Sequence, residues 1–272
     1  MFLLYLFARI SQLYANRLPA LLIVVLHVIP PALFALAHGA VLYRPKGIAI
    51  FASFCLGIAI LAETVGLSTG FPFGRYFFTG VMGPKIIALP VLLALAYLGI
   101  GYVSWALALL ILGDAGKPLR GTRVLVQPLL AALIMVAWDL SMDPDWSTVD
   151  RAWVWLDGGA YFGVPVSNFF GWFVTAYCYY QAFALYCSAR PVPAPPPRER
   201  LWLPAILMYA ACALGNLLIL SQPMAPPVVS DPAGKEWLTA DILSACALVS
   251  LLVMAPFALL AWLRMREVRQ VA

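Results

Sequence analysis

Long apolar runs separated by short polar loops constrain this chain more than any other feature. Each run is about as long as the roughly 20 helical residues that cross the hydrocarbon core of a bilayer. Charged residues make up 11% of the 272 residues, and the mean hydropathy is +0.92. The sequence therefore predicts an all-α polytopic transmembrane helix bundle of about seven spans, at about 18–40, 48–66, 86–112, 124–141, 164–189, 201–221 and 238–263.

No stretch is left over that could form a soluble domain, so residues 1–272 are predicted to form a single integral membrane domain. Segment 1–17 is apolar but contains Arg9, and no small-residue cleavage site follows it, which argues against a signal peptide. We expect this segment to be an N-terminal interfacial helix or an extension of the first span.

A proline-rich segment, residues 190–200, interrupts the series of spans. Because proline stiffens a linker, we interpret this segment as a stiff cytoplasmic connector. It separates the helices of residues 1–189, which carry every distinctive motif, from two accessory helices in residues 201–272.

The charges of the loops predict the orientation of the bundle, because short basic loops stay in the cytoplasm. The basic loops alternate with acidic ones, and they hold Arg44, Lys46, Lys117, Arg120, Arg123, Arg190, Arg198, Arg200, Arg264, Arg266 and Arg269. This bias predicts a cytoplasmic C-terminus in a bacterial inner membrane, although Arg9 and Arg17 then lie on the exoplasmic side. The net charge of +5 follows from this topology and requires no nucleic-acid partner.

Several chemistries lack the residues that they need. His27 and His38, the two histidines, would lie on one helix face about 16 Å apart, too far to share a metal. Phosphate-binding and dinucleotide-binding motifs are missing, and the last span has no lysine for a retinal Schiff base. The cysteines lie in predicted spans without zinc or disulfide spacing, as packing residues would: Cys55, Cys178, Cys187, Cys212 and Cys246. We expect no metal and no cofactor.

Three carboxyl groups fall where predicted spans end on one side of the membrane. Glu63 lies near the end of the second span, and Asp139 and Asp143 are one helical turn apart at the end of the fourth. A carboxyl inside a span is expensive, so each of these is a candidate functional group. The alternatives are an ion pair with Arg75 that braces the bundle or, for Asp143, a solvated loop acid.

Loops rich in glycine and aromatic residues join these same span ends, at residues 70–80 and 153–165. Such loops can fold back over a pocket. For a single aromatic ring near a span end, the alternative is the ordinary interfacial belt. For Lys85 it is a lysine that extends toward the headgroups. The candidate substrate-binding residues are Arg75, Tyr76, Lys85, Trp138, Tyr161, Asn168 and Trp172.

Two ordered groups of motifs cover most of residues 60–175. The first is Glu63-Thr-Val-Gly-Leu-Ser-Thr-Gly-Phe-Pro-Phe-Gly-Arg-Tyr76, followed by Gly83-Pro-Lys85 and Pro90. The second is Asp139-Leu-Ser-Met-Asp-Pro144, continued by Trp153, Trp155, Gly159, Tyr161-Phe-Gly-Val-Pro165, Asn168-Phe and Gly171-Trp172. In this order the motifs resemble a membrane carotenoid-biosynthesis protein family that includes the bisanhydrobacterioruberin and γ-carotene 1′,2′-hydratases.

The resemblance implies a carotenoid 1,2-hydratase, which adds water to the terminal ψ-end double bond of an acyclic or monocyclic carotenoid. The substrate would come from the lipid bilayer, so membrane lipids surround the protein, and association with other carotenoid-biosynthesis enzymes is compatible with this role. We expect one ψ-end to enter laterally among the second to fifth spans. Its alkene would then reach Glu63, Asp139 and Arg75, which we expect to cluster near one membrane face.

The implied reaction needs a proton donor, which forms a tertiary carbocation, and a water molecule that captures this cation. Glu63 or Asp139 is the hypothesised acid, because a carboxyl in apolar surroundings can stay protonated. Asp143 is the hypothesised base that orients the water. The faces of Trp138 and Tyr161 would stabilise the cation.

Two other functions fit the same residues. A non-catalytic carotenoid or isoprenoid-lipid carrier would use the acids structurally and the aromatic residues as a groove. A cyclase or isomerase would also protonate an alkene. Water access separates the enzymes, because a hydratase must admit water to its site and a cyclase must exclude it.

Overall fold

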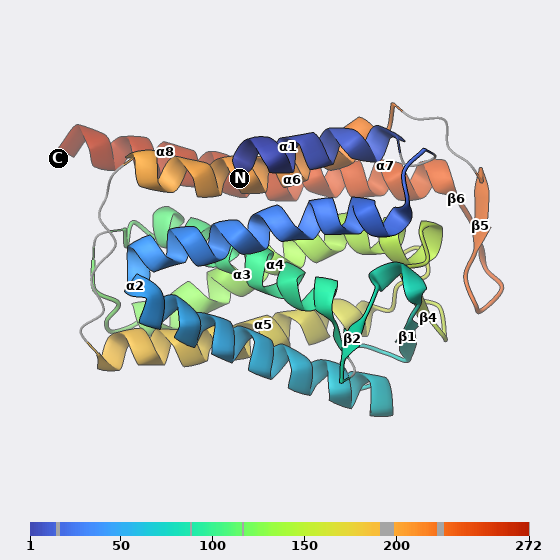
Figure 1. Ribbon diagram of the computed structural model, residues 1–272, viewed down its shortest axis with the longest axis horizontal. Coiled ribbons are helices and arrows are strands. Elements are labelled where there is room, and N and C mark those ends of the chain that lie inside the picture. The colour runs from blue at the N-terminus through green and yellow to red at the C-terminus, as the bar shows by residue number, and fades with distance from the viewer. Residues whose placement is uncertain (15–16, 88, 116, 191–198, 222–225, 272) are drawn as a thin grey trace.

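The structure is a computed structural model that describes residues 1–14, 17–87, 89–115, 117–190, 199–221 and 226–271. It is an elongated bundle of helices with three short two-stranded sheets gathered at one end (Figure 1). The predicted all-α polytopic bundle is confirmed. The elements are α1 Phe2–Ser11, η1 Gln12–Tyr14, α2 Ala20–Thr69, β1 Tyr76–Phe78, η2 Gly80–Met82, β2 Lys85–Ile86, β3 Leu89–Pro90, α3 Val91–Ile111, α4 Arg123–Asp143, η3 Pro144–Val149, β4 Trp153–Trp155, α5 Val166–Ala189, α6 Glu199–Ile219, β5 Val228–Ser230, β6 Glu236–Leu238, α7 Thr239–Val249, η4 Ser250–Met254 and α8 Ala255–Val271.

Five helical stretches in the described chain are long and apolar enough to cross a membrane. They are Ala20–Thr69, Val91–Ile111, Arg123–Val149, Glu199–Ile219 and Thr239–Glu267. The 24-residue helix α5 has the length of a span, but its amide, hydroxyl and phenol side chains make it less apolar than these five. Most of the predicted connector, residues 191–198, lies outside the described residues.

The first two predicted spans are the two arms of α2, and no loop separates them. The chain bends sharply at Arg44, whose backbone leaves the helical region at φ 60° and ψ 164° (Figure 1). Pro45 follows, and proline both lacks an N–H and forces the preceding residue out of the α conformation. The loop that the sequence predicted around residues 41–47 is therefore a bend.

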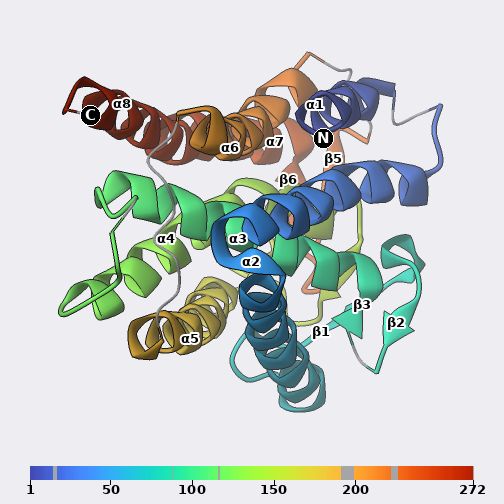
Figure 2. The ribbon, with the colours of Figure 1, turned by 60° about the vertical axis from the view of Figure 1, so that its left-hand side comes forward.

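The N-terminal helix α1 does not extend the first span. A 3₁₀ turn follows it, and α1 then lies beside α2 and α6, parallel to the bundle rather than across its end (Figure 1). The second view shows α1 on the same side of the bundle as α6, α7 and α8 (Figure 2). One face of α1 is buried at Tyr5, Ala8 and Arg9, so this segment belongs to the packed core.

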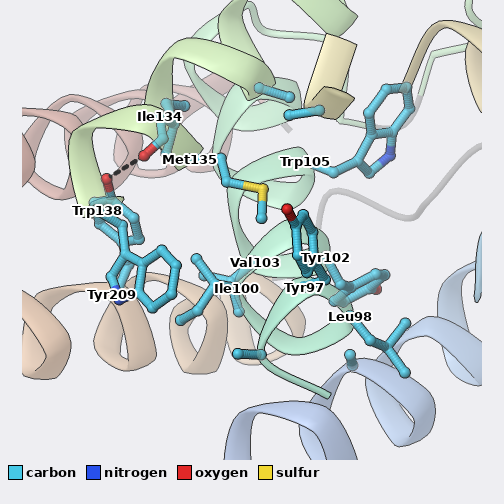
Figure 3. Packing of buried hydrophobic residues seen from close by; sticks show 14 of the residues in the cluster. Tyr97, Leu98, Ile100, Tyr102, Val103, Trp105, Ile134, Met135, Trp138 and Tyr209 are labelled. Carbon is cyan, nitrogen blue, oxygen red and sulfur yellow. Dashed lines mark hydrogen bonds between the residues drawn. The ribbon is translucent and has the colours of Figure 1, made fainter. Parts of the chain in front are cut away.

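Helix α3 forms the centre of the bundle, and nearly every side chain from Leu92 to Leu110 is buried. Its aromatic residues meet α4 and α6 in the core that Figure 3 shows. There the Tyr209 hydroxyl donates to the Ile134 carbonyl oxygen at 2.7 Å. This bond gives the hydroxyl a hydrogen-bond partner, which lipid could not provide.

One of the strand pairs brings distant helix ends together. Strand β1, after α2, pairs antiparallel with β4, after α4, so that Tyr76 lies opposite Trp155. Strands β2 and β3 pair before α3, and β5 and β6 pair before α7. The pairing of β1 with β4 fixes the ends of α2 and α4 next to the start of α5.

We expect Gly99→Ala to destabilise the bundle. A Cβ at Gly99 would lie 2.8 Å from the backbone nitrogen of Ala32 and from Pro31 Cβ, so α3 would have to move away from α2. Such overpacking lowers the free energy of unfolding by about 1–3 kcal/mol. Gly57→Ala is the control, because nothing lies within 4 Å of its added Cβ. Thermal unfolding in one detergent measures both, and equal midpoints would contradict the close approach of α2 and α3.

Candidate functional site

Three buried carboxyl groups lie at the end of the bundle that holds the short strands. Glu63 is 3% exposed, and Asp139 and Asp143 are each 1% exposed. Glu63 comes from the last turns of α2, and the two aspartates come from the last turns of α4. Each of them needs donors, because a buried charge or polar group without a partner is costly.

Two tyrosine hydroxyls hold Glu63. Tyr76 on β1 donates to its Oε2, and Tyr97 on α3 donates to its Oε1 at 3.0 Å. One turn beyond Glu63, Gly66 leaves the space that the rings occupy, since a Cβ there would lie 2.7 Å from the Phe73 ring and 3.1 Å from the Tyr76 hydroxyl. The carboxyl of Glu63 is thus fixed from two elements at once.

One side-chain amide joins the two aspartates. Asn168, in the first turn of α5, donates from Nδ2 to Asp139 Oδ2 at 3.0 Å and to Asp143 Oδ2 at 2.6 Å. On its other oxygen, Asp143 accepts from the indole nitrogen of Trp153 at 2.9 Å and from that of Trp155 at 3.4 Å. Asp139 Oδ1 is buried and has no partner among the described residues.

An aromatic pocket lies between Glu63 and Asn168. It encloses about 290 Å³ and is lined by Glu63, Phe73, Tyr76, Phe78, Leu93, Trp153, Trp155, Asn168 and Trp172. Its rings are held in place by one another. Trp172 stacks on Tyr97 with centroids 4.3 Å apart, and the Tyr76 and Trp155 rings are 4.9 Å apart. Among the described lining residues, Glu63 supplies the carboxyl group.

A more polar pocket of about 220 Å³ lies on the other side of Trp155. It is lined by Ser147, Thr148, Arg151, Val154, Trp155, Gly163, Ser230, Asp231 and Pro232. Trp155 lines both pockets, and the Ser147 hydroxyl donates to the Asp143 carbonyl oxygen at 2.7 Å. The polar pocket and the aromatic pocket thus share one lining side chain, that of Trp155.

Arg75 does not pair with a buried carboxyl, so the alternative of an ion pair between Arg75 and Glu63 or Asp139 does not hold. Its guanidinium instead binds Asp157 in an ion pair whose side chains are 67% and 53% exposed. The hydrogen bond from Arg75 and its positive charge lower the pKa of Asp157. Tyrosine hydroxyls can satisfy Glu63 without burying a second charge, which explains why the arginine stays at the surface.

The other predicted residues divide between the pocket and its surroundings. Lys85 is exposed and donates to the Phe78 carbonyl oxygen at 3.2 Å. Tyr161 donates to the Leu140 carbonyl oxygen at 3.1 Å, and burial raises its pKa. Trp138 meets the edge of Trp172 with centroids 6.0 Å apart, outside the aromatic pocket. The pocket itself takes Tyr76, Asn168 and Trp172 from the predicted set.

Sequence reasoning missed Tyr97, Trp153 and Trp155 as parts of the site. A signal existed for the two tryptophans, because alternate residues of an extended Trp-Val-Trp segment point to the same side. Tyr97 lies within an apolar span, where its sequence neighbours give no indication that it faces Glu63.

The two histidines lie away from these carboxyls and bind protein groups. His27 hydrogen-bonds with the Ile23 carbonyl oxygen and Gln12, and His38 with Tyr102 and the Leu201 carbonyl oxygen. Within the described ranges, no three histidine, cysteine, aspartate or glutamate side chains group as metal ligands would.

The sequence that builds this site matches the model of one known protein family. Residues 14–231 match the family model described as carotenoid biosynthesis protein, which covers all the residues of the carboxyl cluster and its pocket. No curated protein and no solved structure matches the chain.

We expect Asn168→Leu to destabilise the protein more than Ser167→Ala. The leucine leaves two buried carboxyls without their shared donor, which lowers the free energy of unfolding by about 1–3 kcal/mol or more. Ser167 is a suitable control, because its hydroxyl makes one hydrogen bond, to the Phe73 carbonyl oxygen. Loss of this hydrogen bond lowers the free energy of unfolding by about 0.5–1.5 kcal/mol. Thermal and denaturant unfolding measure both, and equal losses would mean that Asn168 does not join the aspartates.

Proposed function

The chain belongs to the carotenoid biosynthesis protein family, and we propose that it is a carotenoid 1,2-hydratase, a carbon–oxygen lyase that adds water to a ψ-end double bond. The observation that carries this proposal is the carboxyl of Glu63 facing a pocket otherwise made of aromatic rings, one leucine and one amide. Protonation of an alkene needs an acid in apolar surroundings, and the cation that forms needs π faces nearby.

Glu63 is the proposed acid. It lines the pocket, whereas Asp139, the other predicted candidate, does not. Transfer of its proton to one alkene carbon forms a C–H bond and leaves a tertiary cation on the other carbon. The hydroxyls of Tyr76 and Tyr97 then stabilise the carboxylate that remains, because charge-assisted hydrogen bonds are the strong ones.

Asn168 and Asp143 are the proposed residues that handle water. Both amide hydrogens of Asn168 can serve the aspartates, and its Oδ1 makes no hydrogen bond within the described chain, so it can accept one from a water in the pocket. The water oxygen bonds to the cation and loses one proton to Asp143. This carboxyl does not itself line the pocket but accepts hydrogen bonds from Trp153, Trp155 and Asn168, which do.

The surrounding spaces suit the two reactants. The aromatic pocket of about 290 Å³ fits an end group rather than a whole carotenoid, so the polyene chain would stay among the helices and lipid. The polar pocket behind Trp155 would supply the water from the loop side. The reactants then meet where the bilayer ends, with lateral entry for one and aqueous entry for the other.

Expression in a host that makes lycopene or γ-carotene tests this function. We expect extracted pigments to gain one water by mass spectrometry. Glu63→Gln should lower this gain about 10²–10⁴-fold, because the amide keeps the shape of the side chain but cannot donate a comparable proton. Asp157→Asn is the control, since it changes an exposed carboxyl at the same end of the bundle. Full hydration by Glu63→Gln would rule out Glu63 as the acid.

Asp143→Asn should separate protonation from water capture. The acid is intact in this variant, so the cation forms, but it loses a proton to give an isomer more often than it captures water. We expect less hydrated pigment by about 10²-fold and a new pigment with the mass of the substrate and a different retention time. Hydration at the wild-type rate would mean that Asp143 is not the base.

The same pigment assay separates the other functions. Carotenoids that co-purify with the protein and remain unchanged would favour a carrier. Ring formation without added water would favour a cyclase or isomerase.

A further inference from the structure

A third and larger cavity lies between α1, α2, α3, α4 and α6. It encloses about 600 Å³, and most of its walls are apolar. Arg9 and Asn216 line one end of the cavity, and Leu93 and Trp153 line the part next to the aromatic pocket. The described wall of this apolar cavity holds one charged side chain.

That charged side chain is Arg9, which is 6% exposed. Its Nη2 donates to the Cys212 carbonyl oxygen at 3.1 Å and to Asn216 Oδ1 at 2.7 Å. Its Nε is packed against Gly215 of α6 without a hydrogen-bond partner, and its Nη1 makes no hydrogen bond in the part of the chain that the structure describes. The guanidinium is thus held in place but only partly satisfied.

No carboxylate among the described residues forms an ion pair with Arg9 within 4.0 Å. Asp145 interacts with it electrostatically, but from farther away. A guanidinium that stays charged in an apolar bundle is expensive unless an anion meets it. The Nη1 of Arg9 is therefore left to meet an anion at hydrogen-bonding distance that the described residues do not supply.

We propose that this cavity binds an apolar chain that ends in a single carboxylate, with the carboxylate on Arg9 and the chain along the apolar wall. A single guanidinium balances one negative charge. An isoprenoid diphosphate would bring more charge than the cavity can neutralise, because the described lining holds no second arginine and no lysine. A neutral alcohol would leave the charge of Arg9 as it is.

The geometry of α6 is adapted to Arg9. A Cβ at Gly215 would lie 1.7 Å from Arg9 Nε and 2.2 Å from its Cζ, so a larger residue could not stand there while the guanidinium keeps its place. Arg9 and Tyr5 also precede residues 14–231, the part of the chain that matches the family. The proposed site thus draws on residues outside the matched region.

The cavity adjoins the aromatic pocket through Leu93 and Trp153, which line both. The indole nitrogen of Trp153 donates to Asp143 at 2.9 Å. A bound acyl chain would therefore contact the ring that orients Asp143.

Direct binding to the purified protein in a non-ionic detergent tests the proposal. The probes are oleate against oleyl alcohol, and retinoate against retinol, so that each pair differs in charge and the two pairs differ in chain type. We expect each carboxylate to bind at least about tenfold more tightly than its alcohol and to raise the unfolding temperature, as a ligand of the folded state does. The tighter carboxylate identifies an acyl or an isoprenoid chain.

Three variants show whether Arg9 is responsible. Arg9→Gln should lose the preference for carboxylate, Arg9→Lys should keep part of it, and Arg17→Gln, at an exposed arginine, should keep all of it. If Arg9→Gln does not fold, Gly215→Ala provides a second test, because it displaces the guanidinium and keeps the charge. Equal binding of acid and alcohol by the wild-type protein, or tighter binding of farnesyl diphosphate than of either acid, would overturn the proposal.

Discussion

The burial of three carboxyl groups in an apolar bundle is the constraint on which the rest of this end of the molecule depends. The side-chain donors that bind these carboxyl oxygens come from other elements of the fold. They are tyrosines from β1 and α3, an amide from α5 and indoles from β4. Those donors must arrive together, since one missing donor leaves a costly buried group. The pairing of β1 with β4 brings Tyr76 and Trp155 into place at once. The need of each buried carboxyl for hydrogen-bond donors thus links the pairing of the strands, the helix ends and the aromatic pocket.

The apolar periodicity of the sequence was sufficient to predict the bundle, because a bilayer sets the length of each span and leaves few alternatives. The carboxyls were predictable for a related reason, since charge inside a span needs a purpose. The hydrogen-bond partners of these carboxyls could not be predicted from the sequence. Charge complementarity suggested Arg75, but neutral donors cost less to bury than a guanidinium, so tyrosine and asparagine took that place. The bend at Arg44 was equally hidden, because Pro45 in an apolar context is compatible with a loop or a kink.

Arg9 shows how a charge can mislead a topology argument. As a loop residue it contradicted the distribution of basic residues, but the structure buries it against α6, where Asn216 and the Cys212 carbonyl oxygen receive its hydrogen bonds. A buried arginine does not count among loop charges. The same contact changes the role of α6, which carried no motif in the sequence. Asn216 also donates to the Ser141 carbonyl oxygen, between the two aspartates of α4, so the accessory helices support the carboxyl cluster from behind.

The position of the acids at the end of the bundle follows from the two reactants that we propose. A carotenoid end group is stable in hydrocarbon, and water is stable in the loops, so the two share little space except where the bilayer ends. An acid at the midplane would meet the alkene without water, and an acid in the loops would meet water without the alkene. At the end of α2, Glu63 faces aromatic rings, and Trp155 lines both that pocket and a more polar one. The position of Trp155 between the two lining sets would then decide whether a cation is captured by water or loses its proton.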